Sequence, residues 1–372
     1  MAQAPGADGK QDAGRYVRAP RQRRRLGLLV EDEVKTGAAT LVQDAFRIGL
    51  ATAFYLAASV THDVVIYGRE HVSGHHPTLL LCNHKRDFDS VVLAGVAYTA
   101  RGISQPNERL IYSLREDAFW PDFLEEYLGW RGPLRLNARG PLRFLKAYPM
   151  GYVRTRADLP RVEGQLRRFA SLLDRGRDLY WTPEGGLSLD GRLERFRAGF
   201  YRIVQMSRAP LHLLPAAIFY DYMTTTRTRC FIRFGPEIPV DRSLSKSALE
   251  QQARRAILSQ MTVNAGHLMA AVLRDLPPGA RLTREEIEHK LLAHARHYRA
   301  AGLPLDGRLI RHGSFRRRVS KLLQYLQRQR ILAFDGRYWG VYEGMDHKEM
   351  RYVLNELLET ESALGIEPLS AG

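Results

Sequence analysis

Cysteine is scarce in this chain of 372 residues: only Cys82 and Cys230 occur, and they stand far apart. Two distant cysteines exclude a disulfide framework and a zinc knuckle, and they suit a reduced cytoplasmic setting. No cluster of His, Cys and Asp residues has the spacing of metal ligands, so we expect no metal site. The G-x-S-x-G turn of serine hydrolases is also missing, because "GGLSLDG" has the wrong spacing.

Long hydrophobic runs are missing too. The longest runs from Ile48 to Val60 and falls short of the ~20 residues that cross a bilayer. A buried core helix and a helix in the membrane interface both explain it. Arginine-rich sequence between Arg15 and Arg25 precedes it, either as a solvated basic arm or as a contact with anionic lipid. We expect a basic, largely disordered tail over 1–35 and an apolar membrane-interface helix over 36–62.

Acidic residues are outnumbered by basic ones: 40 Asp and Glu stand against 56 Lys and Arg, which gives a formal net charge of +16. Such a charge favours polyanionic partners, namely nucleic acid, anionic lipid headgroups or phosphorylated small molecules. Hydrophobic content of 45% and charged content of 26% are ordinary values for a globular protein, so a packed core is expected. Composition alone does not choose among the three partners.

From Val64 onward, short apolar runs such as "TLLLCN", "DLYWT" and "LHLLPAAIFY" alternate with helical patterns. This alternation predicts an α/β fold over 63–276, with a layered mixed sheet flanked by helices. After a break at "PPG", Thr283 and Glu286 form a capping-box pattern that begins a second helical group. We therefore expect a smaller, mainly helical accessory domain over 282–372, with the domain boundary near 276–282.

A histidine and an aspartate follow the apolar run "TLLLC" in the stretch "NHKRDFD". His84 stands where a strand stops and Asp89 where a helix starts, so a loop can bring the two side chains together. Asp89 would then fix the imidazole tautomer and leave the other ring nitrogen of His84 free as a general base. The alternative is that Asp89 only caps the helix and His84 is a surface loop residue.

Two further stretches carry polar residues after apolar runs. In "YWTPEGG", Glu184 is followed by Gly185 and Gly186, whose backbone can approach a ligand closely and whose amides can bind a phosphate or a hydroxyl. In "GYVRTR", Arg154 and Arg156 are two apart at the end of a predicted strand, so both guanidiniums would face one side and could hold a phosphate. The alternative is a strand edge protected by charge.

These stretches, in this order, resemble the glycerolipid acyltransferase family, which acylates glycerol-3-phosphate and its mono-acyl product. The resemblance covers residues 64–220, and it also includes "YSLREDAFWPDF" and "LLPAAIF". It places the family's H-x-x-x-x-D box on His84 and Asp89, its arginine box on 151–156 and its F-P-E-G box on 182–185. It implies the family's fold and an O-acyltransferase of phospholipid biosynthesis.

The resemblance also assigns roles. His84 would remove the proton of an acceptor hydroxyl that attacks an acyl thioester, with Asp89 as its orienting partner. The acceptor's phosphate would be held by Arg115, Arg154 and Arg156. The acceptor's hydroxyls, or the oxyanion of the tetrahedral intermediate, would be bound by Glu184, Gly185 and Gly186.

Two departures leave the acceptor open. Arg86 stands near the place where members usually carry a serine or threonine. Glu184-Gly185-Gly186 differs from the Glu-Gly-Thr of many lysophosphatidate acyltransferases and, with "S-x-x-G-R-L" after it, looks more like the branch that acylates glycerol-3-phosphate or dihydroxyacetone phosphate. The acceptor is therefore glycerol-3-phosphate or 1-acylglycerol-3-phosphate.

The implied partners are anionic. Acyl-CoA or acyl carrier protein would supply the thioester as a co-substrate, with no further cofactor. Anionic lipids would hold the protein at the cytoplasmic face of the cell membrane, as a peripheral or monotopic protein. Nucleic acid is the less favoured partner, although "SFRRRVSKLLQYLQRQR" followed by "ILAFDGRYWGVY" predicts a basic helix and a hairpin with a type I′ turn at Asp335-Gly336, the shape of a winged helix.

Overall fold

The computed structural model describes residues 58–72, 75–86, 89–100, 109–115, 147–151, 153–277, 279–342 and 347–369, with five further positions between 49 and 56. The predicted basic tail over 1–35 lies outside the described residues. Of the apolar helix predicted over 36–62, the described positions between 49 and 61 are helical.

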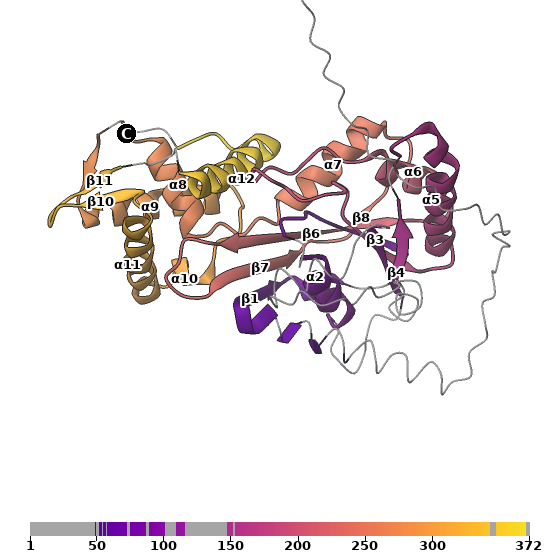
Figure 1. The fold of residues 1–372 in the computed structure, drawn as a ribbon, viewed down its shortest axis with the longest axis horizontal. Coiled ribbons are helices and arrows are strands. Elements are labelled where there is room, and N and C mark those ends of the chain that lie inside the picture. The colour runs from indigo at the N-terminus through magenta and orange to yellow at the C-terminus, as the bar shows by residue number, and fades with distance from the viewer. Residues whose placement is uncertain are drawn as a thin grey trace, which may run out of the picture.

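A mixed sheet forms the centre of the larger part of the molecule (Figure 1). Its strands follow the order β1-β7-β6-β2-β5-β3-β4, and β8 pairs with β6. Strands β2, β3, β4, β5 and β6 run parallel to one another, whereas β7 and β8 are antiparallel to β6, and β1 runs parallel to β7. The bounds are β1 (His62–Tyr67), β2 (Thr78–Cys82), β3 (Leu110–Arg115), β4 (Ala147–Met150), β5 (Asp178–Trp181), β6 (His212–Asp221), β7 (Thr228–Phe234) and β8 (Ile238–Pro239). The layered mixed sheet predicted from the sequence is confirmed.

Helices cover both faces of this sheet, which explains why β2 and β6 read as continuous apolar runs. On one face, Leu80 and Cys82 of β2 pack with α2 (Asp89–Tyr98). On the other face, Leu79 and Leu81 pack with three helices: α5 (Leu159–Asp174), α6 (Ala198–Met206) and α7 (Lys246–Leu258). The alternation follows from the two-residue period of a strand. Figure 1 shows α2 on the opposite side of the sheet from α7.

The C-terminal part consists of helices and a small antiparallel sheet of order β10-β11-β9. Its elements are α8 (Ala265–Arg274), β9 (Arg281–Leu282), α9 (Arg284–Ala300), α10 (Gly307–Ile310), α11 (His312–Arg328), β10 (Leu332–Phe334), β11 (Trp339–Val341) and α12 (Lys348–Leu364). The predicted capping box is present, because the side chains of Thr283 and Glu286 each accept the other's backbone N–H. The predicted type I′ turn is wrong: that turn needs positive φ at both central residues, and Gly336 is the one residue of the turn with positive φ.

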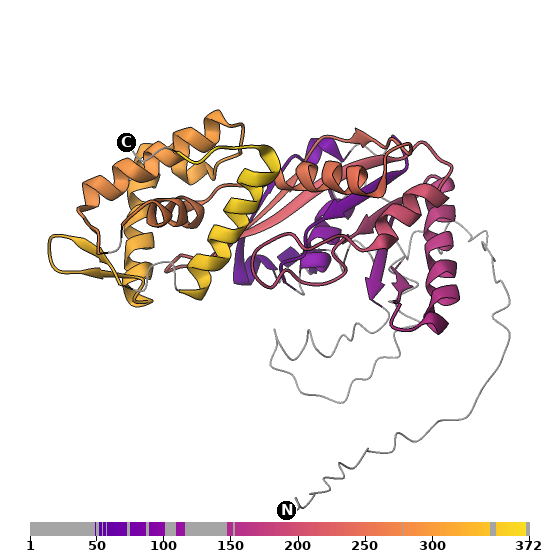
Figure 2. The same cartoon turned by 90° about the horizontal axis from the view of Figure 1, so that it is seen from above.

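Packing is continuous between the two parts. Helix α8 contacts both α9 and α12, and one hydrophobic cluster extends from β2 to α12. Buried ion pairs add to this contact: the Arg318 guanidinium of α11 donates to Asp221 at 2.6 and 2.7 Å, and Arg229 pairs with Asp306. Figure 2 shows α12, in yellow, between the remaining C-terminal helices and the large sheet.

Candidate active site

The predicted site residues gather at one edge of the sheet. Because β2 to β6 are parallel to one another, their carboxyl ends meet at the same edge, where α/β folds place their ligands. His84 follows β2, Arg115 ends β3, and Glu184 follows β5. Asn83 anchors the first of these loops, since its buried side chain donates to the carbonyl of Ile218 at 2.9 Å and accepts the N–H of Ile218 at 2.8 Å.

Asp89 is a fully buried carboxylate at the start of α2. Its Oδ2 accepts the backbone N–H groups of Lys85 at 2.5 Å and Arg86 at 2.7 Å, and its Oδ1 accepts the hydroxyl of Tyr220. The imidazole Nδ1 of His84 lies 3.7 Å from Oδ2 and has no hydrogen-bond partner among the described residues. This distance exceeds a hydrogen bond but allows Asp89 to attract an imidazolium. Asp89 therefore holds the loop in place through hydrogen bonds to its backbone and also faces the His84 ring.

Tyr220 is a site residue that sequence reasoning missed. Burial, with the nearby Asp89 carboxylate as the next cause, raises the pKa of Tyr220 well above its usual value. The hydroxyl therefore keeps its proton and donates a hydrogen bond to Asp89, which stabilises a carboxylate that has no solvent contact. Its signal in the sequence is weak: Tyr220 is one aromatic residue near the end of an apolar strand.

Glu184 is almost fully buried, and both of its carboxylate oxygens are used by backbone amides. Oε1 accepts the N–H of His84 and Oε2 the N–H of Glu194, each at 2.8 Å. Burial is the main cause that raises the pKa of Glu184 to about 7. The carboxyl group therefore joins the loop after β2 to the loop after β5. A second bond between these loops runs from the N–H of Ser188 to the carbonyl of His84 at 2.8 Å.

The two glycines after Glu184 differ in their surroundings. Gly185 has a φ of +68° and donates its N–H to the carbonyl of Thr182 at 3.2 Å, which closes a turn. A Cβ placed on Gly186 would meet nothing within 4 Å, so the backbone at this position borders open space. Gly186 therefore has space beside its backbone.

The arginine pair is placed differently from the sequence prediction. Strand β4 ends at Met150, so Arg154 lies in a bend and Arg156 begins the short 3₁₀ helix η2 (Arg156–Asp158). The prediction that both lie on a strand is therefore wrong. Both side chains are exposed, and the carboxyl end of β4, which precedes them in the chain, lies at the same sheet edge as His84. Strand β4 is three strands from β2, which corresponds to about 14 Å at the usual strand spacing. The side chain of Arg115 lies outside the described residues.

Two basic residues inside the H-x-x-x-x-D box also take defined positions. The guanidinium of Arg86 lies over the rings of Tyr220 and Tyr222, at 4.9 and 4.7 Å from their centroids. The ammonium of Lys85 is buried and donates to the carbonyl of Gly191 at 2.5 Å. Sequence reasoning assigned a role to neither.

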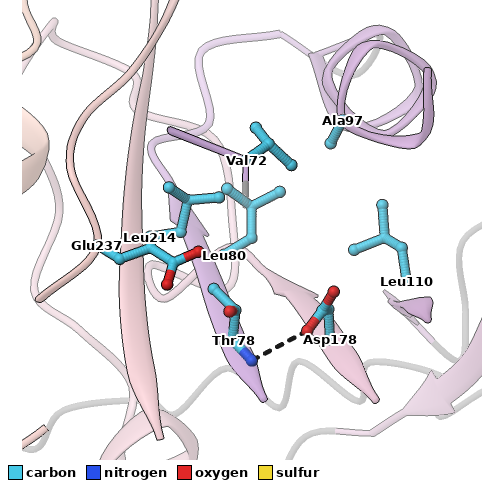
Figure 3. Close-up of a pocket in the computed structure, with 8 residues that line it drawn as sticks. All are labelled: Val72, Thr78, Leu80, Ala97, Leu110, Asp178, Leu214 and Glu237. Atoms are coloured by element: carbon cyan, nitrogen blue, oxygen red, sulfur yellow. Dashed lines mark hydrogen bonds between the residues drawn. The ribbon is translucent and has the colours of Figure 1, made fainter. Parts of the chain in front are cut away.

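The pocket in Figure 3 lies at the opposite edge of the sheet. Thr78 and Asp178, whose hydrogen bond of 3.1 Å is drawn there, begin β2 and β5, and Leu110 begins β3. The pocket is therefore separate from the His84 edge. Within the described part of the chain, no three His, Cys, Asp or Glu residues are grouped to hold a metal ion. No helix in that part is long and apolar enough to cross a membrane.

Comparison with known proteins shows what this chain is similar to. Residues 63–219 match the family model described as Acyltransferase. Among solved structures, the chain is similar to the 1-acyl-sn-glycerophosphate (LPA) acyltransferase PlsC from Thermotoga maritima, with 15% identity and a TM-score of 0.38 over 60% of this chain and 81% of that one. None of the proteins with curated descriptions matches.

Proposed function

Because residues 63–219 belong to the Acyltransferase family, the protein is an acyltransferase, and we propose that it acylates a glycerol phosphate. The acyl group comes from a thioester, either acyl-CoA or acyl carrier protein. The acceptor is a hydroxyl of glycerol-3-phosphate or of 1-acylglycerol-3-phosphate. The observation that carries this proposal is the partly exposed His84 ring beside the fully buried Asp89 carboxylate.

His84 acts as the general base in this scheme. Nδ1 faces Asp89, so Nε2 takes the proton from the acceptor hydroxyl while that oxygen attacks the thioester carbonyl. The new C–O bond forms, the C–S bond breaks, and the imidazolium returns the proton to the departing thiolate. Asp89 stabilises the imidazolium, and Tyr220 holds Asp89 in place. General-base assistance of this kind contributes on the order of 10²–10⁴-fold in rate.

The acceptor's phosphate is held by arginines at the same sheet edge. Arg154 and Arg156 present exposed guanidiniums there, and Arg115 ends the strand between β4 and β5. Guanidinium groups bind phosphate through paired hydrogen bonds. The open space at Gly186 admits the acceptor or the oxyanion of the tetrahedral intermediate. Glu184 acts indirectly, because its oxygens hold the loops that carry His84 and Gly186.

The experiment supplies the purified protein with glycerol-3-phosphate and lysophosphatidate in parallel, each with CoA and carrier-protein thioesters. His84→Ala is expected to lower kcat by about 10²–10⁴-fold on the better pair. His289→Ala is the matched control, because His289 is exposed on α9. Full turnover by His84→Ala would overturn the proposed role, and no turnover of either acceptor by the native protein would overturn the proposed substrate class.

A second candidate function concerns residues 280–342 alone. The sheet order β10-β11-β9 beside α11 has the arrangement of a winged helix, and exposed positions of α11 include Arg316, Arg317 and Arg328. Duplex nucleic acid would be its ligand. Binding of residues 280–372 to duplex DNA, measured against salt, tests this: a log–log slope with micromolar affinity supports it, and no binding at low salt rejects it.

A further inference from the structure

The residue next to His84 forms a buried ion pair with the last helix of the chain. The ammonium of Lys85 lies 3.2 Å from Oε1 of Glu356 on α12, and the two side chains are only 2% and 1% exposed. The same ammonium donates to the carbonyl of Gly191 and lies over the rings of Phe219 and Tyr352. A charge that is buried away from water needs a close partner of opposite charge, and Lys85 and Glu356 are such partners for each other.

The second oxygen of Glu356 is also fixed. Oε2 lies 3.0 Å from Nε2 of His267 on α8. The other ring nitrogen of His267, Nδ1, accepts the backbone N–H of Asn264 at 3.2 Å, so the ring proton is on Nε2 and is donated to Glu356. His267 is therefore neutral, and Lys85 is the cation that balances Glu356. The chain of contacts runs from the start of α8 through Glu356 to the His84 loop.

Helix α12 holds the loop after β5 with the same face. Tyr352, Asn355, Glu356 and Glu359 have the spacing of one helix face. The side-chain amide of Asn355 donates to the carbonyl of Asp190 at 2.9 Å, and Glu359 accepts the N–H of Leu193.

Two more contacts hold the loop after β5. A Cβ on Gly191 would stand 2.2 Å from the carbonyl oxygen of Tyr352, so the backbones of loop and helix touch. Arg254 of α7 pairs with Glu359 and donates to the carbonyls of Leu193 and Glu194 at 2.6 and 2.8 Å.

We propose that Glu356 is a positioning residue for His84 and acts through Lys85, with α12 as the element that holds both catalytic loops in register. This inference rests on the proposed function, in which His84 is the base. Glu356 touches neither the substrate nor the His84 ring. It sets where the His84 backbone lies, because Lys85 is the next residue and because the α12-bound loop contacts His84 through Glu184 and Ser188.

The test compares two buried charges of the same helix. Glu356→Gln weakens the hold on Lys85, and kcat is expected to fall by about 10- to 100-fold with little change in KM, since small misplacement of a base costs this much. Glu361→Gln is the matched control. Glu361 is also buried on α12 and pairs with Arg274 at 2.9 Å and with Tyr298 at 2.6 Å, away from both loops. This variant is expected to lower the midpoint of unfolding but to keep the kcat of the folded enzyme.

The double variant Lys85→Met/Glu356→Gln separates positioning from stability. It removes the unpaired charge that either single change leaves, so the unfolding midpoint is expected to return toward that of the native protein while kcat stays low. Recovery of both would show a merely structural role and overturn the proposal. The double variant also supplies the kinetic test should Glu356→Gln fail to fold.

A second readout does not depend on turnover. The ¹⁵N resonances of the His84 ring are expected to shift in Glu356→Gln and to stay unchanged in Glu361→Gln. Unshifted resonances with native kcat in Glu356→Gln would overturn this inference alone. Native turnover by His84→Ala would instead overturn the proposed function on which it rests.

Discussion

At the scale of single residues, Glu184 shows how burial changes a group that the sequence presents as a ligand. Its carboxyl group faces two backbone amides inside the protein, and its pKa rises from 4.5 to about 7 because burial outweighs those two bonds. Around neutral pH, then, this group changes charge in the folded protein, whereas in the unfolded chain it changes charge near pH 4.5.

The pKa of Glu184 predicts a pH dependence of stability. A raised carboxyl pKa means that the folded state holds the proton more tightly, so this group stabilises most below pH 4.5, and that contribution is lost as the pH rises to about 7. Between pH 5 and 7.5 the native protein should therefore lose about 2 kcal/mol relative to Glu184→Gln. Urea unfolding of both proteins at several pH values measures the difference; a pH-independent difference would contradict the prediction.

Tyr220 supplies a second prediction at this scale. Tyr220→Phe removes the hydroxyl that binds Oδ1 of Asp89, which is expected to lower kcat by about 10-fold and stability by about 1–3 kcal/mol. The matched control is Tyr298→Phe, which removes another buried hydroxyl that donates to a carboxylate, that of Glu361. The control should lose stability but keep kcat in steady-state assays. Equal kinetic effects of the two changes would argue against a role of Tyr220 in the site.

At the scale of elements, the loop after β5 depends on a close approach of two backbones. Gly191 has a φ of +94°, and Tyr352 of α12 lies where a side chain would begin. Gly302 has a φ of +85° but open space around it. The two glycines share a backbone conformation and differ in their neighbours.

This difference predicts unequal effects of alanine. Gly302→Ala should cost about 1–2 kcal/mol of stability, the price of a left-handed backbone, and leave kcat unchanged. Gly191→Ala should cost more and should also lower kcat, because the loop must move away from α12 or displace it. Thermal unfolding and steady-state kinetics on both variants measure this. Similar values for the two variants would mean that the contact with Tyr352 carries no weight.

At the scale of the whole molecule, charge and packing have separate roles. Inside, oppositely charged pairs such as Arg318 with Asp221 join the C-terminal helices to the sheet. Outside, a net charge of +16 gives a field that attracts anions, including the proposed thioesters, glycerol phosphate and lipid headgroups. We propose that this field and residues 36–62 place the enzyme at the cytoplasmic face of the cell membrane.

Vesicle sedimentation tests the membrane proposal. The full chain should sediment with vesicles of phosphatidylglycerol and phosphatidylcholine, and less so as salt rises, because the contacts are electrostatic. It should bind phosphatidylcholine vesicles weakly. A chain without residues 1–61 should lose most of the binding. Unchanged sedimentation of the shortened chain would rule out the N-terminal segment as the anchor.

Several features could be predicted from the sequence because they depend on neighbours in the chain. Apolar runs located β2, β5 and β6, and the end of the first run placed His84 at a sheet edge. Local spacing also identified the capping box at Thr283. Local spacing gave the wrong position for β4, where the strand is "AYPM" and not the "GYVRT" that follows. It also gave the wrong turn type at Gly336. Both features depend on the register with a partner strand, which local spacing does not contain.

The sequence by itself determined strands such as β2, β5 and β6, the loop that carries His84 and Asp89, and the net charge, since these follow from residue type and short-range periodicity. Only the tertiary structure decided which groups meet there. Tyr220 and Glu356 lie far along the chain from Asp89 and Lys85, and both face buried partners. No local pattern specifies such pairs, because what brings them together is the packing of β6 beside β2 and of α12 against the loops.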